Sequence, residues 1–347
     1  MYLEDKTVLI TGGTGSLGNK LTEIILESCR PRKLIILSRD ELKQYEMSEK
    51  FKNPLLRFFI GDVRDKERLY RAFEGVDYVI HAAALKQVPA AEYNPFEVIK
   101  TNILGAKNII DVSMDAGVKK VVALSTDKAV NPVNLYGATK LCSDKLFVSG
   151  NSYAGSKPTR FSVVRYGNVA GSRGSVIPLF LKMKKTGVMP ITDKRMTRFW
   201  ITLDESADFV LKSLERMRGG EIFVPKIAST PIVDVAKAIV PECTFNLIGI
   251  RPGEKLHEVL ISKEDGRHTL EYDDHFVVEP HFPWWGAEKK KKGSRVPEGF
   301  TYSSDSNEMK LDRFQLNKII REFDSNVKKT YRIRRPNNRR GRYKVCT

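Results

Sequence analysis

LSTDKAVNPVNLYGATK, which runs from Leu124 to Lys140, is the segment around which this chain is organised. It begins as the end of an apolar run, residues 121–124, that predicts a buried parallel strand. Polar residues follow the strand, and in open α/β sheets ligands bind at that end. Asn131-Pro132 then predicts a turn, and the helix after it carries Tyr136 and Lys140. Because these two share one helix face, the ammonium favours the phenolate, and Tyr136 could act as a base.

A Tyr-x-x-x-Lys pair alone is more often a packed ring and a solvated charge, so its neighbours matter. A strand over Thr7–Ile10 leads into TGGTGSLG, residues 11–18, and then into a helix from Leu17 to about Ser28. Glycines at this spacing let the backbone approach a pyrophosphate, which then faces the helix N-terminus. The sequence therefore predicts a dinucleotide site here. Its expected residues are Gly12, Thr14, Gly15, Ser16, Leu17 and Gly18.

The second expected strand, Lys33–Leu37, indicates which dinucleotide binds. An acid directly after it would accept hydrogen bonds from a ribose diol. Here Ser38 and Arg39 come first, and Lys43 lies one helical turn beyond Arg39. These cations suit a 2′-phosphate, which favours NADP. Asp40 keeps NAD possible, and Arg39 could instead only stack on adenine.

Strand and helix patterns alternate from Thr7 to Arg165 in about six units, which predicts an α/β Rossmann fold with a doubly wound parallel sheet. After the strand Leu56–Ile60, Asp62 could bond the adenine amino group. Small residues at Ala82–Ala84, after the strand Tyr78–His81, would let a cofactor lie against the backbone. Lys86 could reach a nicotinamide ribose or a substrate phosphate. A last strand of this series is expected at Phe161–Arg165.

The chain changes character after about residue 170, where a smaller C-terminal α/β substrate-binding region begins. Thr202–Glu205 predicts a capping box that opens a helix, Glu221–Val224 a strand that rejoins the main sheet, and Thr230–Ile239 a further helix. Gly187–Arg198 resembles a loop. The predicted division is a Rossmann NADP-binding domain of residues 1–170 plus about 201–225, a substrate-binding region of 171–200 plus about 226–322, and a basic tail, 325–347.

Arginines outside the Rossmann pattern are candidates for binding a substrate diphosphate. Arg173, Arg198 and Arg251 all lie in the segments assigned to the second region. Guanidinium groups bind phosphate oxygens bidentately. The alternative is that each is an ordinary surface arginine.

The net charge of +17 owes nine positive charges to Ser325–Thr347, which contains no acid. This predicts a disordered basic arm that solubilises the protein or binds an anionic surface, and it disfavours nucleic-acid binding by the rest of the chain. The chain has no run of about 18 apolar residues and begins without a secretory signal. Four scattered cysteines form no CxxC pair, so no metal site is expected. These features favour a cytoplasmic protein without membrane contact.

Thr11–Gly18, Ser125–Lys128 and the Tyr136/Lys140 pair together resemble the extended short-chain dehydrogenase/reductase superfamily. Longer segments resemble the inverting UDP-N-acetylglucosamine 4,6-dehydratases that begin pseudaminic acid synthesis. These are SRDELKQYEMS from Ser38, STDKAVNPVNLYGATK from Ser125, YGNVAGSRGSVIP from Tyr166, MTRFWITLDE from Met196, IRPGEKLHEVL from Ile250 and PEGFTYSSD from Pro297.

The resemblance implies a hydro-lyase with a transient redox step. Tyr136, held by Lys140 and near Thr126, would take the C4 hydroxyl proton while hydride passes to the nicotinamide. Lys128 would remove the C5 hydrogen, Asp127 would protonate the leaving C6 oxygen, and the hydride would return to C6. Dehydratases that retain C5 resemble Thr-Asp-Glu at this turn, whereas Thr-Asp-Lys implies inversion to UDP-2-acetamido-2,6-dideoxy-β-L-arabino-hex-4-ulose. As a base, Lys128 must be partly neutral; the alternative is an ion pair with Asp127.

The resemblance also implies binding residues and a homo-oligomer, hexameric or dimeric. It adds to the cofactor set Asp62, Val63, Ala82, Ala83, Ala84, Lys86, Thr101, Asn102, Tyr136, Lys140, Tyr166, Asn168 and Val169. Its implied UDP-sugar contacts are Lys86, Asn168, Arg173, Ser175, Val176, Thr192, Arg198, Arg251 and Glu254. Two alternatives stay open: a related UDP-sugar 4,6-dehydratase/5-epimerase of a capsule or fucosamine-type pathway, and a basic nucleic-acid-binding Rossmann protein.

Overall fold

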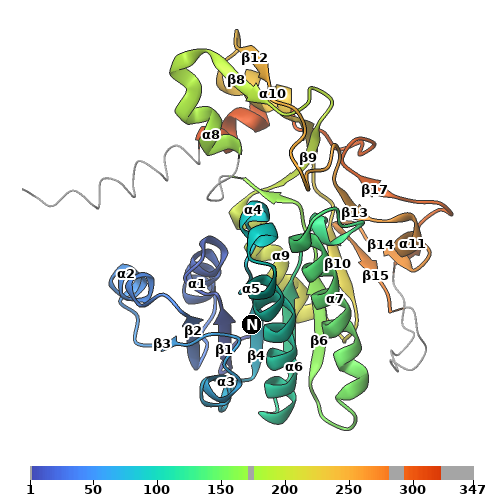
Figure 1. Cartoon of the computed structure of the whole chain (residues 1–347). Helices are drawn as coiled ribbons and strands as arrows, with labels where there is room; N and C mark the ends of the chain where they lie inside the picture. Colours follow the sequence, from blue (N-terminus) through green and yellow to red (C-terminus); the bar gives the residue numbers. More distant parts are fainter. Residues whose placement is uncertain (1, 171–175, 281–292, 322–347) are drawn as a thin grey trace, which may run out of the picture.

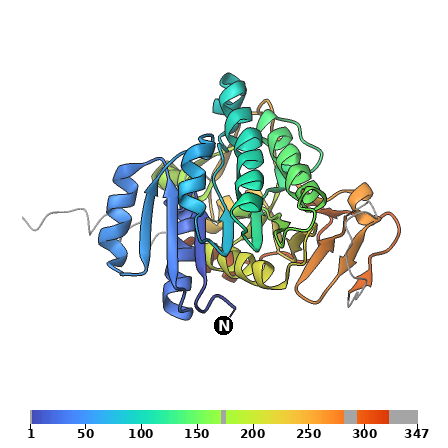
Figure 2. The same ribbon diagram turned by 90° about the horizontal axis from the view of Figure 1, so that it is seen from below.

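A large sheet covered by helices on both faces forms the main body of the protein (Figures 1 and 2). The computed structural model describes residues 2–170, 176–280 and 293–321. Its first half contains, in order, β1 (Thr7–Thr11), α1 (Ser16–Ser28), β2 (Lys33–Ser38), α2 (Glu41–Phe51), β3 (Leu56–Ile60), α3 (Lys66–Phe73), β4 (Tyr78–His81), α4 (Val88–Tyr93), α5 (Pro95–Ile99), the π-helical turn η1 (Lys100–Leu104), α6 (Gly105–Asp115), β5 (Lys120–Leu124), the 3-10 turn η2 (Asp127–Ala129), α7 (Leu135–Tyr153) and β6 (Arg160–Val164).

These six strands are all parallel and lie in the order β3-β2-β1-β4-β5-β6. This is the order of a doubly wound Rossmann sheet, and the fold prediction is confirmed. The strands are apolar because helices cover both faces: α1 packs on α9, while α3, α6 and α7 pack side by side. All five residues of β1 are buried. The carboxyl ends of β1, β4 and β5 therefore meet at one edge of a rigid core.

The second half of the described chain extends this sheet and builds a smaller region. Its elements are β7 (Asn168–Val169), α8 (Val176–Met183), the 3-10 turn η3 (Lys184–Thr186), β8 (Val188–Ile191), β9 (Thr197–Ile201), α9 (Leu203–Arg216), β10 (Ile222–Pro225), β11 (Ser229–Pro231), α10 (Ile232–Ile239), β12 (Thr244–Leu247), β13 (Val259–Ile261), α11 (Lys263–Gly266), β14 (Thr269–Glu271), β15 (His275–Val278), β16 (Ser294–Arg295), β17 (Tyr302–Ser303) and a helix over 313–321.

Two expectations for this half are confirmed and one is wrong. β10 joins the sheet parallel to β6, and Thr202 with Glu205 forms the capping box that opens α9. The segment Gly187–Arg198, expected as a loop, instead contains β8 and the start of β9. β8 is held by pairing with β12, which lies far along the chain. The sequence around Pro190 did not indicate a strand, because nothing near it shows that β12 would be its pairing partner.

The boundary of the smaller region also differs from the expected one. β15, β14 and β16 extend the main sheet as antiparallel strands beyond β10, although they fall within the range assigned to substrate binding. A separate apolar core joins α8, β8, Trp200 of β9, α10 and the C-terminal helix; most of it lies apart from the sheet at the top of Figure 1. No helix among the described residues is long and apolar enough to span a bilayer. The basic tail, 325–347, lies outside the described residues.

Candidate active site

The glycine turn after β1 is shaped for close approach of a ligand. Gly12 has φ +64°, and a Cβ there would lie 2.9 Å from the backbone N and Cα of Ala83. A Cβ on Gly18 would lie 2.3 Å from the carbonyl oxygen of Gly13, so glycine lets α1 pack on the turn. The first turn of α1 has no acid, and its N-cap, Gly15, provides no side-chain cap. The positive end of this helix therefore suits a pyrophosphate, and the residues fit a dinucleotide.

A second loop of the cofactor cradle follows β4. Asn102, in the π-helical turn η1, accepts a hydrogen bond from the Leu85 amide and donates to the Leu85 carbonyl and to Thr139 Oγ1. Its amide group is thus used to hold this loop, so any role toward the cofactor is indirect. Thr101 is buried beside it, and its Oγ1 has no hydrogen-bond partner among the described residues. A π-turn at this point is a common feature of functional sites.

The turns after β2 and β3 bring the predicted adenosine-binding residues together. Arg39 Nη1 lies 3.3 Å from Asp62 Oδ2, and Arg64 Nη2 lies 2.8 Å from the same oxygen. Asp40 caps α2 by accepting the Lys43 amide, and its carboxylate also pairs with Lys43. Each of the two predicted cations is therefore paired with a carboxylate, Arg39 with Asp62 and Lys43 with Asp40.

The predicted catalytic turn, Thr126–Lys128 after β5, is a compact hydrogen-bonded unit and is called the catalytic turn below. Thr126 Oγ1 accepts the Lys128 amide at 3.3 Å and donates to Asp127 Oδ1 at 2.9 Å. Lys128 Nζ donates to the same Asp127 oxygen at 3.0 Å and lies 3.5 Å from Asn168 Oδ1. Asp127 is fully buried. The motif thus places a hydroxyl, a carboxylate and an ammonium in direct contact.

Helix α7 brings Tyr136 to this turn. Asn134 caps the helix by accepting the Gly137 amide, and a Cβ on Gly137 would lie 2.1 Å from the Lys128 carbonyl oxygen. Glycine at this position lets helix and turn pack directly together. Burial raises the pKa of Tyr136 to about 12, against the Lys128 ammonium and a hydrogen bond with Thr126. The predicted association of Thr126, Tyr136 and Lys128 is therefore present in the fold.

Lys140 lies one turn after Tyr136 on α7. The cation that opposes the raised pKa of Tyr136 is Lys128, whereas the sequence pattern assigned this effect to Lys140. Lys140 is buried, and burial lowers its pKa despite the opposing charge of Asp144. Its own charge acts on His81, which contacts Thr11 Oγ1 at 2.8 Å. Lys140 thus lies among buried polar groups between β1, β4 and α7.

Lys128 is a partner in two ion pairs, which oppose the partly neutral state expected of a base. Burial lowers its pKa, but the carboxylates of Asp127 and Glu258 outweigh burial and raise it overall. The ammonium is held 3.0 Å from Asp127 Oδ1 and 3.3 Å from Glu258 Oε1. The alternative interpretation, an ion pair with Asp127, is the one observed. To act as a base, Lys128 must first give up a proton.

The smaller region contributes cations to the same place. Arg198 is 6% exposed and donates to the carbonyls of Leu256 and Lys255, so it is not a surface arginine. It lies 3.4 Å from Glu254 Oε1. Lys255 Nζ donates to the Val130 carbonyl directly after the catalytic turn. The predicted Arg198 and Glu254 therefore lie together beside the catalytic turn.

Only some of the other predicted residues lie near the catalytic turn. Lys86 is exposed, and incomplete hydration of its ammonium together with the Lys128 charge lowers its pKa. Tyr166 is buried, and burial and Tyr136 raise its pKa. Arg251 is exposed on a turn, and Thr192 follows β8 without a described bond to the catalytic turn. Val176 begins α8. Arg173 and Ser175 lie outside the described residues.

Three buried polar residues at the site were missed by the sequence argument: Glu258, His81 and Asp144. Asp144 accepts Ser125 Oγ at 2.7 Å and lies 3.5 Å from Arg165 Nη2. For Asp144 the signal was available, since it lies four residues after Lys140 on the same helix face. For Glu258 no local pattern distinguishes it, because the ammonium that it pairs with, Lys128, comes from the other half of the chain.

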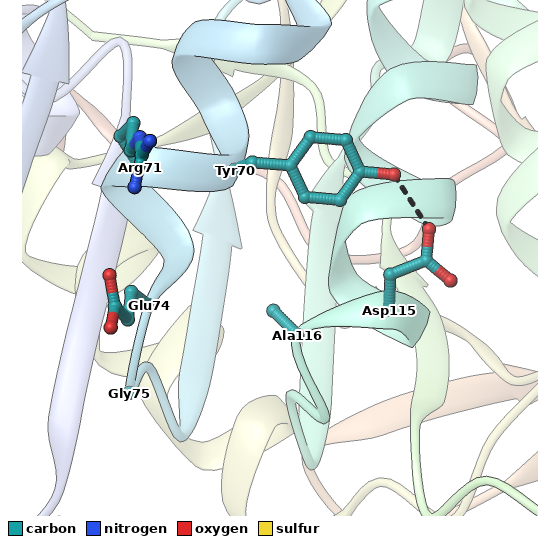
Figure 3. Close-up of a pocket in the computed structure, with 6 residues that line it drawn as sticks. All are labelled: Tyr70, Arg71, Glu74, Gly75, Asp115 and Ala116. Atoms are coloured by element: carbon teal, nitrogen blue, oxygen red, sulfur yellow. Dashed lines mark hydrogen bonds between the residues drawn. The ribbon is translucent and has the colours of Figure 1, made fainter.

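A separate shallow pocket lies far from this chemistry (Figure 3). It lies where α3 and α6 end, beside Tyr70, whose hydroxyl donates to Asp115 at 2.7 Å. Gly75 and Ala116, also in its lining, precede β4 and β5, so the pocket is at the amino-terminal edge of the sheet. Ligands of this fold bind at the opposite edge. Within the described part of the chain, no group of three His, Cys, Asp or Glu is arranged to hold a metal.

Comparison with known proteins agrees with this geometry. Residues 8–280 match the polysaccharide biosynthesis protein family. An inverting UDP-N-acetylglucosamine 4,6-dehydratase of Campylobacter jejuni is 56% identical over 91% of this chain and 97% of its own. A UDP-glucose 4-epimerase of Rickettsia canadensis is 45% identical over 79% of this chain and 83% of its own. The X-ray structure of Pen from Bacillus thuringiensis has a TM-score of 0.86 and 35% identity, over 93% of this chain and 99% of that one.

The family match spans both the glycine turn and the catalytic turn, and the 56% identity extends over the substrate side as well. The chain belongs to the polysaccharide biosynthesis protein family, in the part of it that contains the inverting UDP-N-acetylglucosamine 4,6-dehydratases.

Proposed function

We propose that the protein is an NADP-dependent, configuration-inverting UDP-N-acetylglucosamine 4,6-dehydratase, a hydro-lyase. The observation that carries this proposal is the packing of Thr126-Asp127-Lys128 against Tyr136, next to a glycine turn that fits a dinucleotide. The 56% identity to a relative named for this activity supports it. The product would be UDP-2-acetamido-2,6-dideoxy-β-L-arabino-hex-4-ulose, the first intermediate of a pseudaminic acid-type pathway.

The residues divide the reaction among them. A bound nicotinamide supplies the transient hydride acceptor. Tyr136 takes the proton of the C4 hydroxyl as a phenolate, which the Lys128 charge and the hydrogen bond with Thr126 favour against the effect of burial. Once C4 is a ketone, the C5 hydrogen is acidic, and Lys128 removes it after losing its own proton. Asp127, in hydrogen-bonding contact with Lys128, protonates the departing C6 oxygen.

The UDP group would bind on the cationic side of the site. Arg198 and Lys255 line it, and Lys86 lies close enough for its pKa to be lowered by Lys128. Cations held in fixed geometry suit a diphosphate. The proposed contacts remain Lys86, Asn168, Arg173, Ser175, Val176, Thr192, Arg198, Arg251 and Glu254. A cytoplasmic location and a homo-oligomer, hexameric or dimeric, belong to the same proposal.

The decisive experiment is incubation with UDP-N-acetylglucosamine in deuterated water, with the product read by NMR. We expect a 4-keto-6-deoxy sugar with deuterium at C5 and inverted coupling constants. Tyr136→Phe should slow its formation by about 10²-fold or more. Tyr153→Phe, at the exposed end of the same helix, is the matched control. An unchanged sugar would refute the proposed substrate.

The same spectrum tests the neighbouring functions. A 4-epimerase, the activity named for the Rickettsia relative, would give the galacto isomer with its C6 hydroxyl intact. A 4,6-dehydratase/5-epimerase of a capsule or fucosamine-type pathway would give a product epimerised further. Lys128 beside Asp127 favours the dehydratase, because C4 epimerisation needs neither a C5 base nor an acid for C6.

A further inference from the structure

Glu258 lies between the catalytic turn and the smaller region, and the proposed mechanism does not yet use it. Its side chain is 3% exposed, and Oε1 lies 3.3 Å from Lys128 Nζ. The same oxygen lies 3.8 Å from Arg198 Nε, and Oε2 lies 3.8 Å from Lys255 Nζ. Oε2 accepts no hydrogen bond from any described residue. A buried carboxyl group with one oxygen that accepts no hydrogen bond is costly for the folded state. Its presence here points to a function.

The backbone holds this carboxyl group firmly. The Glu258 amide donates to Ser304 Oγ at 2.9 Å, and its carbonyl accepts the Ser304 amide at 2.8 Å. Ser304 is fully buried, and β13 begins directly after Glu258. The carboxyl group is therefore presented from a rigid frame, as a group that must keep a fixed distance from Lys128 would be.

The electrostatic surroundings suit a proton acceptor. Burial and the Asp127 carboxylate raise the pKa of Glu258, against the charges of Lys128, Arg198 and Lys255. Lys128 lies between the carboxyl groups of Asp127 and Glu258. Glu258 is the one on the side of the smaller region.

The other titratable groups that face Lys128 are three cations, Lys86, Arg198 and Lys255, and the phenol of Tyr136. None is suited to take its proton, because the first three are themselves cations and Tyr136 is assigned to the C4 hydroxyl. Among the described residues, the acceptors within reach of the ammonium are therefore the carboxyl groups of Asp127 and Glu258.

We propose that Glu258 is a positioning residue that accepts the surplus proton of Lys128 and so leaves the neutral amine that removes the C5 hydrogen; this inference rests on the proposed function. An N–H bond of the ammonium breaks and an O–H bond forms at Glu258 Oε1, which cancels both charges. Asp127 stays ionised, and its hydrogen bond keeps the amine aimed at the substrate.

The elimination then balances. The Lys128 amine takes the C5 hydrogen as a proton, and the electron pair left behind forms the C5–C6 double bond as the C6–O bond breaks. A proton passes from the new ammonium across the 3.0 Å hydrogen bond to Asp127 Oδ1 and on to the departing oxygen, which leaves as water. Lys128 is neutral again, and Glu258 has kept its proton throughout.

The test isolates the C5 step. The 4-keto product, made by the wild-type protein, is returned to the enzyme in deuterated water, and exchange of its C5 hydrogen is followed by NMR as a function of pH. If the Lys128 proton stays inside the protein, the wild-type exchange rate is flat between about pH 6 and pH 9. A rate that rises about tenfold per pH unit, as when the proton is lost to water, would overturn the inference without any mutation.

Glu258→Gln keeps the shape and removes the acceptor. We expect exchange about 10²-fold slower at neutral pH, a rise of about tenfold per pH unit, and an unchanged ability to oxidise C4, seen as reduced nicotinamide on mixing with UDP-N-acetylglucosamine. Asp265→Asn, which removes a carboxylate paired with Arg165 rather than Lys128, should keep the flat profile. The melting temperature of Asp265→Asn also shows how much stability is lost when a partly buried carboxylate of this region is replaced by an amide.

Two results separate the possible failures. If Glu258→Gln exchanges C5 at the wild-type rate with a flat profile, Asp127 takes the proton and the inference about Glu258 is wrong, while the proposed function stands. If the wild-type protein forms no 4-keto product at all, the proposed function fails first and takes this inference with it.

Discussion

The electrostatic environment of single residues at this site depends on charged groups that are distant in the sequence and that the fold brings close. Lys128 contacts a carboxylate next to it in sequence, Asp127, and another from the opposite half of the chain, Glu258. Either anion stabilises the ammonium, and both together outweigh the cost of burial. A lysine in this position is a poor base until one of the carboxyl groups takes its proton. Catalytic competence therefore depends on the whole cluster rather than on the residue type.

Arg39 tests the cofactor preference at the level of one side chain. If it binds a 2′-phosphate, Arg39→Ala loses a charged hydrogen bond of about 1.5–3 kcal/mol, and affinity for NADP falls roughly 10- to 100-fold. Affinity for NAD should hardly change, and this is the internal control. Both are measured by titration calorimetry. An equal loss for the two cofactors would mean that Arg39 only stacks on adenine.

His81 predicts a pH dependence of stability. It is 2% exposed, and burial and the Lys140 charge lower its pKa from 6.5 to about 3. Below pH 6.5 the unfolded chain binds a proton that the folded protein does not, so stability falls as pH falls from 6.5 toward 3, by about 1.4 kcal/mol per unit. His81→Asn, which can still contact Thr11, should lose less stability than the wild type over this range in urea titrations. Parallel curves would contradict the assignment.

At the scale of elements, α7 packs directly against the catalytic turn, and this contact brings Tyr136 to it. The contact requires the absence of a side chain at Gly137, which lies against the Lys128 carbonyl. The turn is held on its other side by Lys255, which bonds Val130. Helix, turn and smaller region therefore determine one another's positions.

Gly137→Ala tests this contact. A Cβ there would lie 2.1 Å from the Lys128 carbonyl oxygen, so either the helix or the turn must shift, at a cost of about 1–3 kcal/mol in unfolding free energy. The dehydration rate should fall by more than the loss of unfolding free energy explains, because the shift separates Tyr136 from Lys128. Ser152→Ala, on the exposed face of the same helix, should change neither. Full activity in Gly137→Ala would show that the packing is not required.

The elements also show how far sequence reasoning reaches. β3 and β4 were predicted at their observed residues, and the other parallel strands within one, because buried parallel strands are short apolar runs with polar ends. β8 was missed, since its stability comes from pairing with β12. Tyr136, Thr126 and Asp127 were placed together because one contiguous motif carries them. Glu258 was not, because its contact with Lys128 exists only after the two halves of the chain fold against each other.

At the scale of the whole molecule, the predicted homo-oligomer has a candidate surface on the outer helices. Tyr93 at the end of α4 and Phe96 in α5 are 86% and 73% exposed. Neighbouring exposed aromatic rings are costly in water and typical of surfaces that another chain covers. The helices that carry them lie beside α7, on the side of the sheet away from α9 (Figures 1 and 2). We expect a second copy of the chain to cover this surface.

Replacing both rings by charge tests this surface. Tyr93→Glu with Phe96→Glu should reduce the mass measured by analytical ultracentrifugation, because two carboxylates per subunit cannot be buried without partners. The melting temperature should stay close to that of the wild type, since neither ring is part of the core. Phe314→Glu is the matched control, because Phe314 is 78% exposed but lies in the C-terminal helix, and it should leave the mass unchanged. If the wild-type protein sediments as a monomer, there is no subunit contact to explain. If the double variant keeps the wild-type mass, the subunit contact lies elsewhere on the molecule.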